Sequence, residues 1–140
     1  MNDLEEKNEL DTRYEVLKIA LQEQNLSDFR ENFLELHIYE QGQFYESLTE
    51  KERAQMYSYL SPKELADMFD SLEEDEDALK EYLEEMRPSY AAAMLSAMYT
   101  DNAVDLLNLL GKKDTAKYLS LMSPEAAAEI KELLHYEDET

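Results

Sequence analysis

Apolar side chains recur at positions i, i+3, i+4 and i+7 along most of the chain, which is the spacing of one face of an α-helix. Four copies of this pattern are complete, namely Leu65-Met68-Phe69-Leu72, Leu79-Tyr82-Leu83-Met86, Ala91-Met94-Leu95-Met98 and Ala103-Leu106-Leu107-Leu110. Partial copies are Met56-Tyr57-Leu60, Tyr118-Leu119-Met122 and Ala127-Ile130-Leu134. The last apolar residues of successive copies lie 12 residues apart, except for one step of 14 between Leu72 and Met86. The pattern predicts a series of short helices.

Helix start signals lie between the copies. Thr49-Glu50-Lys51-Glu52 has the pattern of a capping box, in which Thr49 accepts from the Glu52 amide and Glu52 reaches back. Other starts are predicted where a cap residue or a proline at the first helical position precedes an apolar stripe, at Ser61-Pro62, Arg87-Pro88, Thr100-Asp101 and Ser123-Pro124. Gly111 is suited to closing a helix.

Helices of about nine residues are not stable alone in water, so each must bury its apolar stripe on its neighbours. We therefore expect an all-α fold, a right-handed superhelix or α-solenoid of roughly ten short helices. Two earlier helices, near residues 12–24 and 27–36, cap its amino-terminal end. The predicted domain covers residues 12–136, preceded by an acidic segment, residues 1–11, that is flexible or extends the first helix.

The composition supports this fold and narrows the possible partners. The 140 residues include only 2 glycines and 3 prolines, too few for the turns of a β-rich domain. A formal net charge of −21 repels nucleic acid and anionic membrane surfaces and attracts divalent metals or basic proteins. Alternatively, the acidity only keeps the domain soluble. We find neither a signal peptide nor an apolar run long enough to span a bilayer, so we expect no membrane insertion by this segment.

The sequence lacks the signatures of enzymes and of common cofactor sites. There is no cysteine, and Gly42 and Gly111 stand too far apart to form a phosphate-binding loop. His37 and His135 are isolated and have no metal-ligand spacing. The acidic run at residues 73–77 lacks the alternating ligands and the central glycine of an EF-hand. We expect a protein that is not an enzyme, with no catalytic residue and no organic cofactor.

Asp101 and Asp105 are the best candidates for a metal role. They lie four residues apart on a helix whose stripe, Ala103-Leu106-Leu107-Leu110, faces the core, so both point away from it. Their carboxylates are expected roughly 6 Å apart, with a repulsion on the order of 1–3 kcal/mol. A divalent cation offsets that repulsion, and magnesium prefers hard oxygen ligands while keeping several waters.

Other interpretations of these aspartates stay open at this point. Asp101 can instead cap its own helix, and the positive amino-terminal end of a helix disfavours a cation. Asp67 lies on the polar side of the preceding stripe, alongside Glu64 and Asp70, and is either a third metal position or an ordinary solvated residue.

Three stretches of the chain resemble the amino-terminal domain of the MgtE magnesium transporter family. Leu60–Leu72, LSPKELADMFDSL, is similar to the proline-started helices of that domain, and Thr100–Leu107, TDNAVDLL, to its aspartate-rich segment. Ile130–Thr140, IKELLHYEDET, resembles the segment that leads into a pair of CBS domains. Leu36-His37 resembles the family's Leu-His-Pro helix start, but here Ile38 replaces the proline. The middle domain of a flagellar motor switch protein has similar repeats, but the carboxy-terminal YEDET argues against it.

The resemblance implies a regulatory domain in the cytoplasm, as part of a transporter or channel of the cell membrane. It implies that Asp101 and Asp105 share Mg²⁺ with the CBS domains, and that Asp67 matches a third acidic position. Residues 137–140 would begin the linker to the CBS domains. The other implied partner is a helix of the same polypeptide that leads to the pore, in a full-length homodimer, whereas the fragment itself is expected to be a monomer. Bound magnesium keeps the assembly compact and the pore shut.

A second function stays open beside this one. An acidic α-solenoid can bind a basic protein partner without any metal, and this function requires a concave face with exposed apolar anchors. CBS domains and membrane helices encoded beyond Thr140 would favour the magnesium-dependent function.

Overall fold

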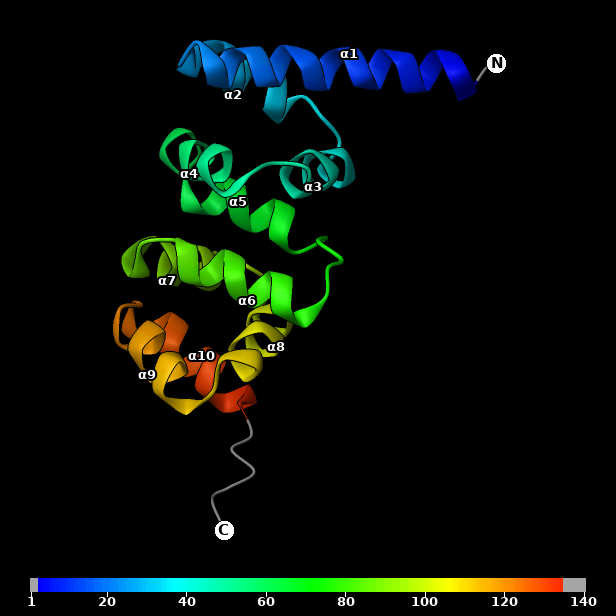
Figure 1. Ribbon diagram of the computed structural model, residues 1–140. Coiled ribbons are helices and arrows are strands. Elements are labelled where there is room, and N and C mark those ends of the chain that lie inside the picture. The colour runs from blue at the N-terminus through cyan, green and yellow to red at the C-terminus, as the bar shows by residue number, and fades with distance from the viewer. Residues whose placement is uncertain (1–2, 135–140) are drawn as a thin grey trace. The chain divides into compact units, whose positions relative to one another are not determined.

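A computed structural model of the chain describes the backbone of residues 3–134 and the side chains from residue 8 onward. Ten helices and no strand occur in this part of the chain, in the order shown in Figure 1. The predicted all-α fold of roughly ten short helices is therefore confirmed. The residues fall into two compact units, divided between Ser61 and Pro62. The predicted linker at 137–140 and His135 lie outside the described residues.

The first unit, which we call unit 1, contains four helices. They are α1 (Asp3–Gln22), α2 (Leu26–Leu34), α3 (Ile38–Glu46) and α4 (Glu50–Tyr59). Because α1 begins at Asp3, it includes most of the acidic segment that the sequence sets apart at residues 1–11. Helix α1 packs against α2, and both pack against α4.

The core of unit 1 is rich in aromatic rings. Phe29 and Phe33 are fully buried and stack with their ring centroids 5.3 Å apart. The buried ring of Phe44 lies 6.3 Å from that of Phe29 and 6.2 Å from that of Phe33. Tyr14 of α1 packs its ring 5.5 Å from the ring of Phe44. Such ring pairs stabilise a core beyond their buried area by about 0.5–1.5 kcal/mol each, so this cluster holds α1, α2 and α3 together.

Two capping boxes start helices in unit 1. Thr49 accepts from the Glu52 amide at 3.2 Å, and Glu52 accepts from the Thr49 N–H at 2.9 Å, as the sequence predicts. His37 caps α3 by accepting from the Tyr39 N–H through Nδ1, while Glu40 accepts from the His37 N–H at 3.1 Å. A capping box therefore starts the helix at the place where the family has a proline and this chain has Ile38.

The second unit, unit 2, contains the remaining six helices. They are α5 (Pro62–Phe69), α6 (Glu76–Glu85), α7 (Pro88–Ala97), α8 (Thr100–Leu110), α9 (Lys112–Ser120) and α10 (Pro124–Leu133). Three of these helices begin at prolines, as predicted, and Ser123 caps α10 by accepting from the Ala126 N–H at 3.2 Å. The apolar stripes form the core as predicted, except that Leu72, Leu79 and Met122 are only half-buried.

Small residues let the helices of unit 2 approach closely. Ala66 of α5 and Ala91 and Ala92 of α7 are fully buried, and α5 packs against α7. Helices α8 and α9 meet at Gly111, whose φ of +87° favours glycine, so one residue both ends α8 and starts α9. The buried Thr115 donates its hydroxyl to the Leu107 carbonyl at 2.9 Å and fixes α9 to α8.

Candidate metal-binding carboxylates

Asp101 and Asp105 lie on the solvent-facing side of α8. Both residues are exposed, whereas Ala103, Leu106 and Leu107 on the other side of the same helix are buried. The helical period of 3.6 residues thus places both aspartates away from the core, as the sequence predicts.

Neither carboxylate is engaged elsewhere in the described part of the chain. The side chains of Asp101 and Asp105 have no hydrogen bond and no ion pair with any residue between 3 and 134. The N-cap of α8 is Tyr99, so Asp101 stands at the second helical position and does not cap the helix. The alternative interpretation of Asp101 as a helix cap is therefore wrong, and both side chains are left to interact with solvent or with a cation.

Asp67 occupies a different setting. It is exposed on α5, and its Oδ1 lies 4.0 Å from the Lys63 ammonium nitrogen, with side-chain exposures of 53% and 77%. An exposed pair of this kind contributes little to stability, about 0–1 kcal/mol. Among the described residues, no three carboxylates or histidines gather into a group that could hold a metal ion. The structure thus leaves Asp67 apart from the pair on α8.

Asp70 is an acidic residue whose contacts the sequence did not reveal. It follows directly after α5 and is half-buried. Its Oδ1 accepts from the Tyr99 N–H at 3.1 Å and from the Asn102 side-chain amide at 3.0 Å, and its Oδ2 lies 3.4 Å from the Tyr99 nitrogen. The carboxylate therefore joins the end of α5 to the start of α8, the helix that carries Asp101 and Asp105.

The acidic run at residues 73–77 has structural roles in unit 2. Asp75 caps α6 by accepting from the Ala78 N–H at 2.8 Å. Glu74 accepts from the Tyr82 hydroxyl at 3.1 Å. Asp75 and Glu74 of this run therefore stabilise α6, one as its cap and the other through Tyr82.

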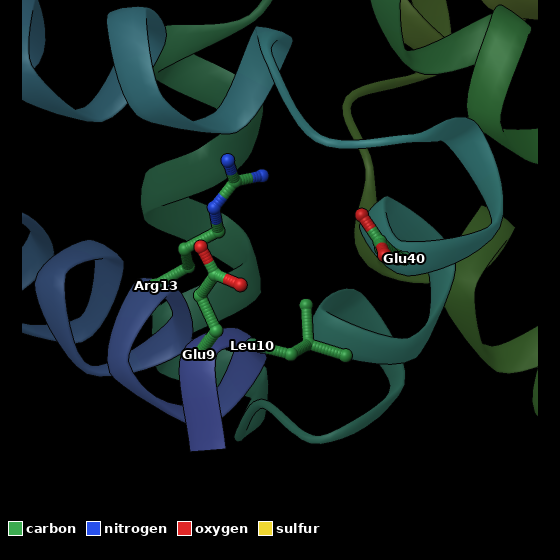
Figure 2. A pocket seen from close by; sticks show the side chains of 4 residues that line it. All are labelled: Glu9, Leu10, Arg13 and Glu40. Atoms are coloured by element: carbon green, nitrogen blue, oxygen red, sulfur yellow. The ribbon is translucent and has the colours of Figure 1, made fainter. Parts of the chain in front are cut away.

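A shallow pocket of about 250 Å³ opens in unit 1. Glu9, Leu10 and Arg13 of α1 and Glu40 of α3 line it, and Figure 2 shows Glu9 and Arg13 side by side with Glu40 across the opening. Burial, together with the negative charges of Glu40 and Asp11, raises the pKa of the neighbouring Tyr14 to about 12. Because the pocket mixes two carboxylates with one guanidinium, it favours neither a cation nor an anion strongly.

No helix in residues 3–134 has both the length and the apolar character needed to cross a membrane. The all-helical fold, the net negative charge and the exposed carboxylates of α8 define an acidic helical-repeat domain.

The chain belongs to the family of MgtE intracellular N domains, whose family model matches residues 36–139. The sequence-based recognition of this family is therefore confirmed. The family description places such domains inside the cell, in agreement with the predicted cytoplasmic localisation.

The chain is similar to a magnesium transporter and to a solved structure of the soluble part of one. It is 64% identical over 137 residues to the magnesium transporter MgtE of Enterococcus faecalis (strain ATCC 700802 / V583), an alignment that covers 98% of this chain and 30% of that protein. It also matches the crystal structure of the soluble part of a magnesium transporter, with a TM-score of 0.86 and 66% identity over 94% of this chain and 51% of the other. The chain thus spans under a third of one relative and about half of the other. Both matches are described as magnesium transporters.

Proposed function

We propose that this chain is the regulatory, cytosolic amino-terminal domain of a magnesium transporter or channel. In this function, Asp101 and Asp105 share Mg²⁺ with CBS domains of the same polypeptide, and the bound ions gate the pore. The observation that carries the proposal is the position of both aspartates on α8, exposed and without a partner in residues 3–134, in a chain that is 64% identical to a magnesium transporter.

The coordination chemistry of magnesium fits two carboxylates on one face of a helix. Mg²⁺ demands an octahedron of oxygens and gives up its waters reluctantly, so it binds through one or two carboxylates and keeps several waters. Asp101 and Asp105 supply up to two such oxygens, and a facing domain supplies the rest. An ion held in this way binds only while the two domains are close together. It therefore stabilises the closed arrangement over the open one.

The charge of the chain provides the opposing force. With a formal net charge of −21, the domain repels any other acidic surface at distances within a Debye length of about 8–10 Å. Divalent cations at the contact neutralise this repulsion. When magnesium is scarce, the repulsion separates the domains and the pore can open.

Asp67 has a lesser role in the proposal. Its carboxylate already lies beside Lys63, so a cation must compete with the lysine for it. We expect Asp67 to add negative charge near a shared ion rather than to anchor one. The helical domain at residues 12–136 and a linker from residue 137 complete the proposed organisation, in a homodimeric full-length protein.

The test uses the chain extended through the cytosolic domains that follow it. Small-angle X-ray scattering measures its radius of gyration with and without millimolar Mg²⁺, for the wild type and for the Asp101→Ala/Asp105→Ala variant. We expect magnesium to compact the wild type, and the double variant to need about tenfold more magnesium or more.

A matched control separates the site from the loss of charge. Glu125→Ala/Glu129→Ala removes two exposed carboxylates with the same four-residue spacing near the start of α10. This control is expected to compact like the wild type. If magnesium leaves the radius of gyration of the wild type unchanged, the gating function is wrong, and binding of a basic protein partner becomes the better hypothesis.

A further inference from the structure

The start of α8 lacks a local side-chain cap, as do the starts of α7 and α9, whereas α2, α3, α4, α6 and α10 each have one. Its N-cap residue, Tyr99, has a side chain that makes no capping hydrogen bond, and 74% of this residue is exposed. In α3 and α4, by contrast, a glutamate at the third helical position accepts from the N–H of the cap residue. The third helical position of α8 is Asn102, whose side-chain amide donates instead.

Asp70 provides the missing acceptor from 29 residues earlier in the chain. Its Oδ1 accepts from the Tyr99 N–H, which is the bond that Glu40 and Glu52 make in their own helices. Asn102 holds the same oxygen through its Nδ2, at 3.0 Å. Asp70 and Asn102 together therefore replace the glutamate of a capping box, with the acceptor attached to α5 instead of α8.

This arrangement affects Asp101 in two ways. Asp101 lies between Tyr99 and Asn102 in the first turn, so one hydrogen bond of Asp70 holds the backbone N–H of Tyr99 before it and the other holds the side chain of Asn102 after it. Asp70 takes the role of the capping-box glutamate, which accepts from the N–H of the cap residue, and the Asp101 carboxylate makes no capping hydrogen bond in this first turn. The negative charge of Asp70 also opposes the positive end of the helix, which otherwise disfavours a cation nearby.

We propose that Asp70 is a positioning residue for the magnesium-binding face of α8, because it holds the first turn in the orientation that presents Asp101 and Asp105. The inference rests on the proposed function of these two aspartates. Asp70 does not contact the ion in this proposal. It acts as the outer partners of metal ligands do, by fixing where the ligands lie.

Three variants of the extended chain test the inference. Asp70→Ala removes both the acceptor and the charge. Asp70→Asn removes the same charge but keeps a carbonyl oxygen where Oδ1 accepts both hydrogen bonds. Asp77→Ala is the control for charge alone, because Asp77 is exposed in the first turn of α6 and has no partner among the described residues.

Two quantities are measured for each variant. One is the magnesium concentration at the midpoint of compaction, from small-angle scattering. The other is the hydrogen-exchange rate of the Tyr99 amide without magnesium, with amides in α5 and α7 as a check that the unit remains folded. For Asp70→Ala we expect a midpoint about tenfold higher and faster exchange at Tyr99. Asp70→Asn and Asp77→Ala are expected to stay near the wild type in both.

The outcomes separate this inference from the function on which it rests. If the wild type compacts and Asp70→Ala shifts the midpoint no more than Asp77→Ala does, Asp70 is not a positioning residue, although the gating function stands. If Asp70→Asn shifts the midpoint as far as Asp70→Ala, charge rather than hydrogen bonding is responsible, and the inference is wrong. If the wild type does not compact, the gating function and the inference both fail, whatever the Tyr99 exchange shows.

Discussion

Units 1 and 2 are both built from short helices, but they hold those helices together in different ways. Unit 1 buries large rings, and Phe29, Phe33 and Phe44 lie in contact at its centre. Unit 2 also buries rings, with those of Phe69 and Tyr82 6.4 Å apart, but it adds small buried residues such as Ala66 and Ala91 among its leucines and methionines. One core depends on filling space with rings, and the other depends also on close approach of the backbones.

The long-range polar contacts also differ between the two units. In unit 1 they tie several pairs of helices, through Tyr14 to the Glu40 carbonyl, Lys18 to Glu52, Arg30 to the Tyr59 carbonyl and Gln55 to the Leu21 carbonyl. In unit 2 the long-range side-chain hydrogen bonds described here converge on Asp70. The candidate magnesium ligands thus lie in the unit where Asp70 joins the end of α5 to the start of α8. There, a single carboxylate can decide how one helix is oriented.

The largest expected effect comes from removing a ring in unit 1. Phe44→Ala should destabilise the protein by about 3–5 kcal/mol, because it leaves a cavity next to three other rings. Urea unfolding followed by circular dichroism gives the loss, and amide hydrogen exchange locates it. Faster exchange should be concentrated in residues 3–61. Equal acceleration in residues 62–134 would contradict the division of stability between two units.

A medium effect is expected from the opposite change in unit 2. Ala91→Leu adds volume to a fully buried position of α7, and should cost about 1–3 kcal/mol through strained packing. Ala93→Leu on the same helix is the matched control, because Ala93 is exposed and its replacement should change the urea midpoint little. If the two variants have the same midpoint, close backbone approach is not what stabilises unit 2.

The smallest effect concerns alkaline pH and Tyr14. The pKa of this tyrosine rises from 10.0 to about 12 in the folded chain, chiefly through burial, with Glu40 and Asp11 adding to it. The stabilisation that accompanies a raised pKa is complete below pH 10 and is lost as the pH rises toward 12. Tyr14→Phe should therefore show a weaker loss of stability over this range than the wild type, in urea titrations at several pH values. Parallel pH profiles of the wild type and the variant would show that the ionisation of Tyr14 does not contribute to the loss of stability at alkaline pH.

Much of the fold is predictable from the sequence because its signals are local. The partners of a capping box lie within four residues, so Thr49 and Glu52 could be paired by spacing alone. The same holds for the 3.6-residue period that places Asp101 and Asp105 on the exposed side of α8. The first turn at His37 was less predictable, since a histidine cap replaces the proline start of the family.

The remaining features depend on contacts between distant residues. Nothing in the sequence near Asp70 indicates that its carboxylate accepts from Tyr99 and Asn102, so it resembled any polar residue that follows a helix. The interpretation of Asp101 as a cap failed because the N-cap of α8 is Tyr99, two residues earlier, which no local cap signal marks. The division of the chain after Ser61 also has no local signal, since a helix start at Pro62 resembles those at Pro88 and Pro124.

The range of the polar contacts has a consequence for how the chain folds during synthesis. Within each unit, the long-range contacts described above join residues 26 to 34 positions apart. At a translation rate of about 5–20 residues per second, both partners of such a contact emerge within about 1–7 seconds of each other. Helical folds with contacts this local form within milliseconds or faster. Each contact is therefore expected to close soon after its second partner leaves the ribosome, so unit 1 can fold while unit 2 is still being made.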